Sequence, residues 1–234
     1  MSNIYKPEEL ENFHQHIIWD GLVKRFVSNQ GFVDYKGFKN NEALLDKYLD
    51  LISVQIPAHD WLSQQKIAFW INAYNAFTVK LILKNYGVAS IKDIETEISP
   101  WKIPFFKIGS EEFTLDKIEH GILRKEFQEP RIHFSIVCAS FSCPKFRNES
   151  FVADKLEEQL EDQTSDFIND PDKNNLFETP IGVSSLFQWY WDDFSNQFAD
   201  TKSLINWMNK YSKTTLDSSS AITYLPYNCA LNGL

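Results

Sequence analysis

The sequence predicts an α+β fold: a mainly helical single domain with a central buried helix and a small, mostly antiparallel sheet. Segments with helical spacing of apolar residues outnumber segments with strand-like alternation, and the two kinds do not alternate strictly. Residues 60–86 are apolar on all sides in the middle of the stretch, which is typical of a helix buried in a core. No repeat, low-complexity tract or Gly/Ser linker marks a boundary, so we expect one domain over residues 1–234.

The first part of the chain is predicted to be almost entirely helical. A proline followed by two glutamates suits the start of a helix over residues 7–28, whose apolar positions keep helical spacing. A short extended piece at residues 31–38 precedes a second helix at 42–52. Asp60 suits the N-cap of the long central helix, and Gly87 suits its end.

The strands are predicted in the second part of the chain. Residues 105–108 and 112–115 flank a Gly-Ser turn and resemble a small hairpin, and a helix follows to about residue 127. Residues 131–138 alternate between two faces and are predicted to form a strand. Four further elements are expected: a helix at 149–168, an extended piece at 176–183, a short aromatic helix capped by Ser184 or Ser185, and a helix at 203–211.

The composition is that of a globular protein rich in aromatic side chains, with 43% hydrophobic and 24% charged residues. The net charge of −9 and the absence of any basic cluster longer than a pair argue against binding to nucleic acid or to an anionic membrane. Three cysteines with no repeated spacing and an N-terminus without a secretory pattern favour a soluble cytoplasmic protein. The oligomeric state is not indicated.

Cys143 is the strongest candidate for chemistry. It ends a Ser-rich turn that follows the predicted strand, and it stands directly before Pro144. Because proline suits the first turn of a helix, we expect Cys143 at or near the N-cap of a following helical turn. Backbone N–H groups and the helix dipole there would favour the thiolate, and Lys145 and Arg147 would add positive charge nearby.

A cysteine nucleophile needs an imidazole within hydrogen-bond reach and a third group to orient the ring. His133 on the predicted strand and His120 on the preceding helix are both candidates for this base. Asp116 and Glu119 share a helical face with His120, so either carboxylate is a candidate for the orienting group. The alternative is that Cys143 is a small hydrophobe in a partly buried position and that His133 is a structural residue with its hydrogen bonds satisfied.

Five polar residues are candidates for binding substrate. Asn72 and Asn75 lie three apart in the apolar central helix, where an unpaired amide costs about 1–3 kcal/mol, so something polar must meet them. They either form an oxyanion site or position a catalytic loop, or they tie down the backbone of the Ser-rich turn; the last interpretation is favoured. Ser140, Ser142 and Lys145 belong to that turn, and Ser140 is a candidate for stabilising an oxyanion.

No metal site or cofactor is predicted. His14 and His16 point to different faces of a helix, and the cysteines have no zinc-binding spacing. Asp192 and Asp193 stand beside the aromatic run at residues 189–191. We interpret this segment as an aromatic anchor with solvated acids rather than as a sugar-binding or substrate-binding surface.

Several spaced segments of the chain together resemble one known family. The clearest are residues 69–76, 115–124 and 131–146, and weaker similarity is found at 187–190, 193–194 and 224–232. These segments resemble signatures of the family known as domain of unknown function 547. The resemblance covers about residues 31–234, with the helix at 7–28 packed on that region. It implies kinship but no activity, because the family has none assigned.

Two functional hypotheses follow. The first is a cysteine-dependent hydrolase or acyl transferase that acts on an amide or thioester of a small-molecule or peptide substrate. The second is a non-catalytic protein-binding or peptide-binding module with an exposed apolar patch around Trp189, Tyr190 and Trp191. An enzyme would bring Cys143, a histidine and a carboxylate into one concave pocket, whereas a module would bury Cys143.

Overall fold

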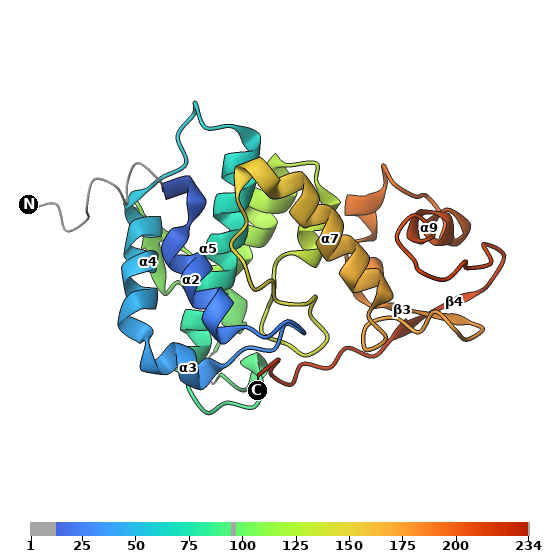
Figure 1. Ribbon diagram of the computed structural model, residues 1–234, viewed down its shortest axis with the longest axis horizontal. Helices are drawn as coiled ribbons and strands as arrows, with labels where there is room; N and C mark the ends of the chain where they lie inside the picture. Colours follow the sequence, from blue (N-terminus) through green and yellow to red (C-terminus); the bar gives the residue numbers. More distant parts are fainter. Residues whose placement is uncertain (1–12, 95–96, 234) are drawn as a thin grey trace, which may run out of the picture.

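The long helix α5 (Ser63–Lys84) is the element around which the others pack (Figure 1). The structure is a computed structural model that describes residues 13–94 and 97–233. Every α5 side chain from Ile67 to Leu83 is buried except that of Lys80, which confirms the predicted central helix. The predicted cap is wrong, because Asp60 lies in the preceding turn and the Gln65 side chain instead accepts a hydrogen bond from the Leu62 N–H.

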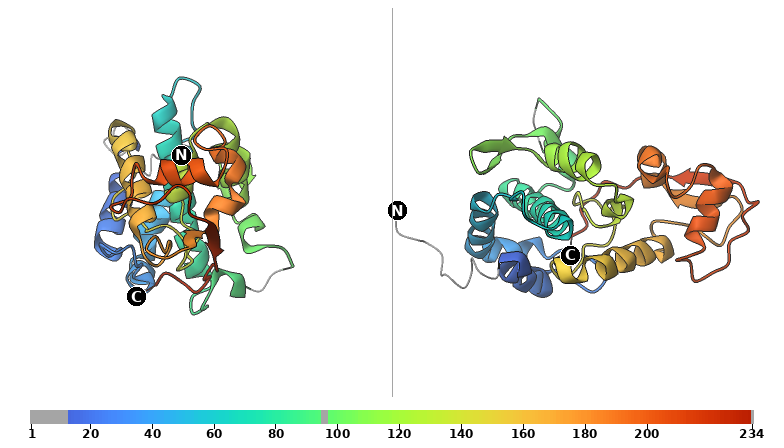
Figure 2. Two further views of the ribbon diagram at one scale, coloured as in Figure 1. Left: turned by 90° about the vertical axis from the view of Figure 1, so that its right-hand side faces the viewer. Right: turned by 90° about the horizontal axis from the view of Figure 1, so that it is seen from above.

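The N-terminal helices cover one side of α5: α2 (Ile17–Phe26), α3 (Tyr35–Asn40) and α4 (Glu42–Val54) (Figures 1 and 2). The predicted beginning of the first helix, at residue 7, lies outside the described residues. The extended piece expected at residues 31–38 is shorter than predicted. Only Val33 makes bridge contacts, since Asp34 accepts a hydrogen bond from the Gly37 N–H and thereby starts α3.

The predicted hairpin packs on α5. Strands β1 (Phe106–Ile108) and β2 (Glu111–Phe113) are antiparallel, and the Phe106 ring stacks on Phe77 of α5 with centroids 3.6 Å apart. The helix that follows widens into a π-helical segment, η4 (Lys117–Leu123), before α6 (Arg124–Glu126). Such π-helical turns are often found at functional sites.

The strand predicted at residues 131–138 is wrong. This stretch contains the 3₁₀ helix η5 (Pro130–Phe134) and then irregular chain. Its apolar side chains are buried on both faces, so the alternation in the sequence does not mark one face of a sheet. The side-chain amide of Asn75 takes the place of a neighbouring strand, because it donates to Ser135 O and accepts from Val137 N, both at 2.9 Å.

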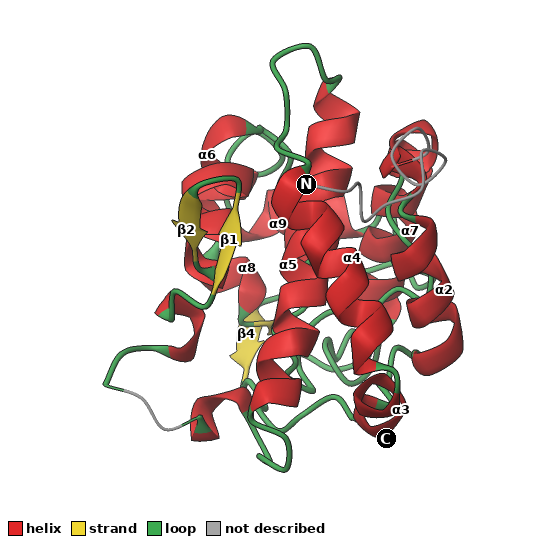
Figure 3. Cartoon of the chain, turned by 90° about the vertical axis from the view of Figure 1, so that its left-hand side faces the viewer, coloured by secondary structure: helices red, strands yellow, loops and turns green. Residues whose placement is uncertain are grey.

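The C-terminal part forms a second apolar cluster beyond α7 (Leu156–Asn169), which begins later than the predicted residue 149 (Figure 1). This cluster contains the parallel strands β3 (Ile181–Ser184) and β4 (Ile222–Leu225) and the helices α8 (Leu186–Trp189) and α9 (Thr201–Met208). Figure 3 shows few strands among many helices, in agreement with a mainly helical α+β fold. Short 3₁₀ helices occur at Phe13–Gln15, Ile91–Asp93, Pro100–Lys102, Ala153–Lys155 and Trp191–Phe194.

The C-terminal segment, residues 226–233, runs back from β4 to the side of α3 (Figures 1 and 2). There Asn232 O accepts a hydrogen bond from Val33 N at 2.9 Å, and Asn232 Oδ1 accepts one from the Tyr35 hydroxyl at 2.7 Å. On its way the segment pairs with the Ser-rich turn. None of the helices in the described part of the chain is both long and apolar enough to span a membrane.

Candidate functional site

One pocket of about 270 Å³ collects most of the side chains that the sequence marks as chemical candidates. Its walls come from η4, from η5, from the Ser-rich turn, from α8 and from the C-terminal segment. Residues far apart in the sequence therefore meet here. Its lining includes Glu119, His120, His133, Cys138, Ser140 and Cys143.

Two cysteine sulfurs are in contact in this pocket. The Sγ atoms of Cys138 and Cys143 are 2.7 Å apart, and both residues are free thiols. The Cys143 sulfur also accepts hydrogen bonds from the Cys138 N–H and from the Tyr227 hydroxyl, each at 3.1 Å. Cys138 is half-buried, whereas only 3% of the Cys143 surface is exposed. Cys138 is thus the more exposed residue of the pair.

The two thiols differ in pKa because they share hydrogen bonds. The hydrogen bond with Cys143 lowers the pKa of Cys138 to about 7, and Ser140 and Tyr227 act in the same direction. Burial raises the pKa of Cys143 well above its ordinary value, and Cys138 raises it further. Coupled groups of this kind lose their protons one at a time. Of the two thiols, Cys138 is the one whose pKa is lowered.

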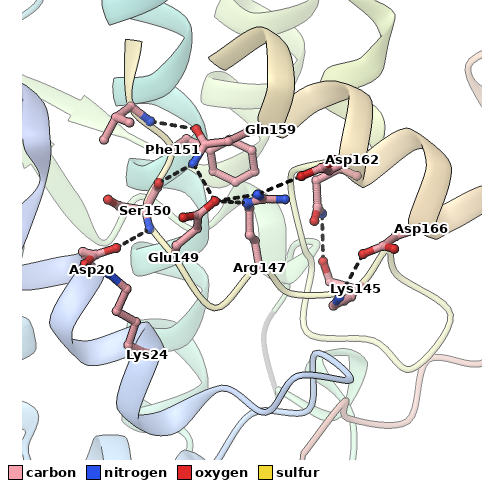
Figure 4. Close-up of polar contacts among 12 residues, drawn as sticks. Asp20, Lys24, Lys145, Arg147, Glu149, Ser150, Phe151, Gln159, Asp162 and Asp166 are labelled. Carbon is pink, nitrogen blue, oxygen red and sulfur yellow. Dashed lines mark hydrogen bonds and ion pairs between the residues drawn. The ribbon is translucent and has the colours of Figure 1, made fainter. Parts of the chain in front are cut away.

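The helical turn predicted after Cys143 is wrong, and burial raises rather than lowers the pKa of the Cys143 thiol. No helix follows Pro144, so neither a helix dipole nor free N-terminal N–H groups face the sulfur. The basic side chains point instead to acidic residues on and before α7 (Figure 4). Lys145 Nζ is 2.8 Å from Asp166, and Arg147 pairs with Glu149 at 2.5 Å.

His133 is held in place by Asp193. Its Nε2 lies 2.6 Å from Asp193 Oδ2, and its ring stacks on Tyr190 with centroids 3.8 Å apart. Arg124 donates two hydrogen bonds to the same carboxylate, of 2.6 and 2.8 Å. The His133 side chain is buried, and its Nδ1 atom has no hydrogen-bond partner among the described residues. That nitrogen is itself buried.

The charges of this pair follow from burial and contact. Burial lowers the pKa of His133 despite the opposing effect of Asp193, so the imidazole is neutral near pH 7 and donates its Nε2–H. Burial favours a raised pKa for Asp193, but the hydrogen bonds from His133 and Arg124 outweigh it and hold that pKa below its ordinary range. The interpretation of Asp193 as a solvated acid is wrong, since it orients the His133 ring.

Glu119 and His120 lie at different depths of the same pocket. Glu119 is buried and accepts hydrogen bonds from the hydroxyls of Tyr74 and Tyr190, at 3.0 and 2.5 Å. The His120 side chain is 40% exposed, and its Nδ1 is 2.9 Å from a nitrogen of Arg124. Neither imidazole makes a hydrogen bond to a cysteine sulfur within the described structure. The Glu119 carboxylate thus accepts hydrogen bonds from two tyrosines, and its Oε1 lies 3.9 Å from His120 Nε2.

Asn72 and Asn75 are absent from the pocket lining, as far as the described residues show. Asn75 ties down the chain just before Cys138, as the favoured interpretation expected. Asn72 bonds instead to both backbone groups of Phe151, at 2.7 and 3.0 Å, so its expected place beside the Ser-rich turn is wrong. In both cases a side-chain amide pairs with backbone that belongs to no sheet.

The Ser-rich turn sends its side chains in different directions. Ser140 lines the pocket, and its Oγ lies 3.6 Å from Cys138 Sγ. Ser142 faces the C-terminal segment, where its Oγ accepts from Asn228 N at 2.9 Å, and Lys145 lines a different cavity. Ala139 has the left-handed φ of 63°, which costs about 1–2 kcal/mol for a residue other than glycine. Such strain is typical of functional turns and stands here next to Cys138.

The sequence reasoning missed Cys138, Asp193 and Tyr227 as members of the site. Cys138 lies in the stretch that resembles a strand in the sequence. Asp193 and Tyr227 reach the site by contacting His133 and Cys143, which are 60 and 84 positions away in the sequence. No group of three or more His, Cys, Asp or Glu side chains in the described structure is arranged to hold a metal ion.

A family model described as "Protein of unknown function, DUF547" matches residues 58–168. Residues 58–168 of the chain are thus similar to this family. The match is narrower than the resemblance over residues 31–234, and it contains α5, η4, the thiol pair and most of α7. Asp193 and Tyr227 lie beyond the matched residues. No curated protein and no solved structure matches the chain.

Proposed function

We propose that this protein is a cysteine-dependent hydrolase or acyl transferase with Cys138 as its nucleophile. One observation carries the proposal. A half-buried thiol whose pKa is lowered to about 7 shares a pocket with His133, an imidazole oriented by a carboxylate. The nucleophile, the base and the orienting group are the three parts that such catalysis needs. The substrate is a small molecule or a peptide.

In the first step the Cys138 thiolate attacks the acyl carbon, and the electron pair of the C=O bond moves to oxygen. The hydroxyls of Ser140 and Tyr227 lie 3.6 Å from the Cys138 sulfur and are the groups placed to stabilise that oxyanion. Burial raises the pKa of Tyr227 well above its ordinary value, so this hydroxyl remains a donor. The thiol pair itself produces the thiolate, without a hydrogen bond to a histidine.

Thioester and amide substrates differ in whether their leaving group needs a proton. An amide nitrogen must be protonated before it leaves, whereas a thiolate leaves without a proton. Because the imidazole of His133 is neutral and its only N–H is engaged by Asp193, the pocket supplies a base rather than an acid. We therefore favour a thioester substrate. In the second step water or an acceptor attacks the acyl carbon while the His133 imidazole, its now buried Nδ1 turned toward the pocket, takes the proton. The C–S bond breaks, the acyl group leaves on the oxygen or on the acceptor, and Cys138 is released as the thiolate.

Turnover of a simple thioester tests this proposal. We expect purified protein to hydrolyse the acetyl thioester of N-acetylcysteamine and to carry a transient acetyl group on Cys138, seen by mass spectrometry. Cys138→Ala should abolish both signals, and Cys229→Ala is the matched control because Cys229 lines the same pocket outside the thiol pair. Full activity of Cys138→Ala, or acetylation elsewhere only, would contradict the assignment.

A non-catalytic binding module remains the second candidate, and two observations favour it. Cys143 is buried, as such a module predicts, and Trp189 is 53% exposed at the pocket wall, where it packs on Tyr227. The exposed apolar patch expected around these three aromatic residues is smaller than predicted, because Tyr190 stacks on His133 and Trp191 packs on Phe198. If thioester binds without turnover and Trp189→Ala weakens that binding, the module is favoured over the enzyme.

The proposal includes two further statements. All three cysteines are free thiols, which supports a reducing compartment such as the cytoplasm. The pocket draws its lining from Tyr74 through Cys229, which supports treating the whole chain as one functional domain.

A further inference from the structure

We propose that Cys138 and Cys143 form a reversible dithiol–disulfide couple that exchanges with low-molecular-weight disulfides. The two sulfurs belong to residues five apart in the chain and are already in contact, at 2.7 Å. This inference does not depend on acyl transfer, since it concerns the bond between the two sulfurs alone.

The contact is fixed by the surrounding backbone. Before the turn, Asn75 holds Val137 N, which precedes Cys138. Within the turn, Cys143 N donates to Ser140 O at 3.0 Å. On the outer side, the C-terminal segment accepts from two turn N–H groups, Phe141 N to Ala230 O and Ser142 N to Asn228 O. The sulfurs are thus positioned before any reaction, which favours a bond between them over a bond to a free thiol.

The two sulfurs have different parts in the exchange. Cys138 is the more exposed residue, and its lowered pKa makes it the attacking thiolate, whereas Cys143 is buried behind it. An attacking thiol with a pKa near the ambient pH reacts fastest. At pH 7 we expect Cys138 to react roughly threefold faster than an ordinary thiol, since its larger thiolate fraction outweighs its lower nucleophilicity.

The exchange balances in two steps. The Cys138 thiolate attacks one sulfur of the low-molecular-weight disulfide, a mixed disulfide forms, and one thiolate leaves. Cys143 then gives up its proton to solvent and attacks the Cys138 sulfur, and the second thiolate leaves. The protein loses two electrons and two protons, and the small disulfide is reduced to two thiols. In the oxidised state neither sulfur of the pair is left as a thiolate for any other reaction.

The chain offers a direct readout, because trypsin cleavage after Arg131 and Lys145 leaves both cysteines in one peptide, residues 132–145. Native protein is treated with oxidised glutathione, unfolded, alkylated with iodoacetamide and digested. We expect this peptide to be lighter by two hydrogens and to take up no alkyl group, whereas untreated protein gives a doubly alkylated peptide. Dithiothreitol applied before alkylation should restore the doubly alkylated form.

Three substitutions separate the roles. Cys143→Ser should leave a stable glutathione adduct on Cys138, because no second sulfur removes it. Cys138→Ser should lower the rate of adduct formation in this peptide at least tenfold, since the remaining sulfur is buried. Cys229→Ser, the matched control, should oxidise like the wild type. The wild-type digest by itself shows whether the disulfide forms, so the proposal is tested even if a variant fails to fold.

Recovery of a doubly alkylated peptide from native wild-type protein, under conditions that oxidise the urea-unfolded chain, would overturn the proposal. A disulfide that joins Cys229 to either residue of the pair would overturn it as well. The two proposals fail separately. A protein without thioesterase activity still forms the disulfide if the couple is real, and an active protein whose peptide stays alkylated has only the acyl chemistry.

Discussion

At the scale of single residues, the orientation of His133 depends on the Asp193 carboxylate. It accepts hydrogen bonds from His133 and from both nitrogens of the Arg124 fork that face it. It therefore fixes the tautomer of the imidazole and leaves Nδ1 as the acceptor. A carboxylate in this role raises the basicity of a neutral imidazole as well as orienting it.

Asp193→Asn should keep the size of this side chain and remove its charge. We expect the breakdown of acyl-Cys138 to slow by about 10²–10⁴-fold, because the imidazole loses its preferred tautomer. The measurement is the lifetime of the acetyl group on Cys138 after thioester is removed. Asp192→Asn is the matched control, since Asp192 is the exposed neighbour. Equal lifetimes in the two variants would remove Asp193 from the mechanism.

His16 provides a second prediction at this scale, on stability. Burial, with a smaller effect from His14, lowers the pKa of His16 to about 3. The unfolded chain therefore binds a proton that the folded chain does not bind between pH 6.5 and about 3. The free energy of unfolding should fall as the pH drops through this window, by up to about 1.4 kcal/mol per pH unit.

Urea unfolding at a series of pH values measures this effect. His16→Asn should flatten the dependence, and asparagine tolerates the left-handed backbone of this position, where φ is 48°. His59→Asn is the control, because His59 is exposed. An unchanged slope in His16→Asn would show that other groups carry the pH dependence.

At the scale of elements, the central helix acts as a partner for chain that has no sheet. Asn75 binds the irregular stretch before Cys138, and Asn72 binds Phe151 in the same manner. Each amide satisfies one donor and one acceptor of buried backbone, which otherwise cost about 1–3 kcal/mol each. A helix and a loop are joined here as two strands are joined in a sheet.

Asn75→Ala should lower the free energy of unfolding by about 2–4 kcal/mol, since it leaves two buried backbone groups without partners. It should also change the rate at which iodoacetamide labels Cys138, because the chain before the thiol loses its anchor. Asn72→Ala is the matched control: a similar loss of stability is expected, with Cys138 labelling as in the wild type. If the two variants label alike, Asn75 does not position the thiol.

The same scale explains what the sequence predicts well. Helices α4 and α5 and the β1–β2 hairpin follow from periodicity and turn residues within a dozen neighbouring positions. The strand prediction for residues 131–138 is wrong because their alternating sequence pattern does not distinguish a strand from an irregular segment. Here the segment is buried on both faces, and a side-chain amide takes the place of a neighbouring strand. Its identification would have required knowing that Asn75 lies opposite.

At the scale of the whole molecule, the pocket is built from contacts that span much of the chain. Asp193 reaches His133 over 60 residues, and Tyr227 reaches Cys143 over 84. Local patterns carry no information on such pairs, which is why the sequence marked His133 and Cys143 but neither of their partners. The family match ends at residue 168, before both partners.

Tyr227→Phe tests the long-range contact with the thiols. The hydroxyl hydrogen-bonds to both sulfurs and lowers the pKa of Cys138, so its removal should raise that pKa. The midpoint of iodoacetamide labelling against pH should move upward from about 7. Tyr224→Phe is the control, because the Tyr224 hydroxyl makes no hydrogen bond within the described residues. Coincident labelling curves for both variants would exclude this contact from the tuning of the pair.

The return of residues 226–233 across the Ser-rich turn has a consequence for biosynthesis. The helices around α5 can assemble while the ribosome is still adding the C-terminal cluster, but the turn gains its outer backbone partners only when Ala230 has emerged. Chain that has not yet reached Ala230 therefore lacks the two outer hydrogen bonds of the turn, and the wall of the pocket is complete only once residues 226–233 are in place.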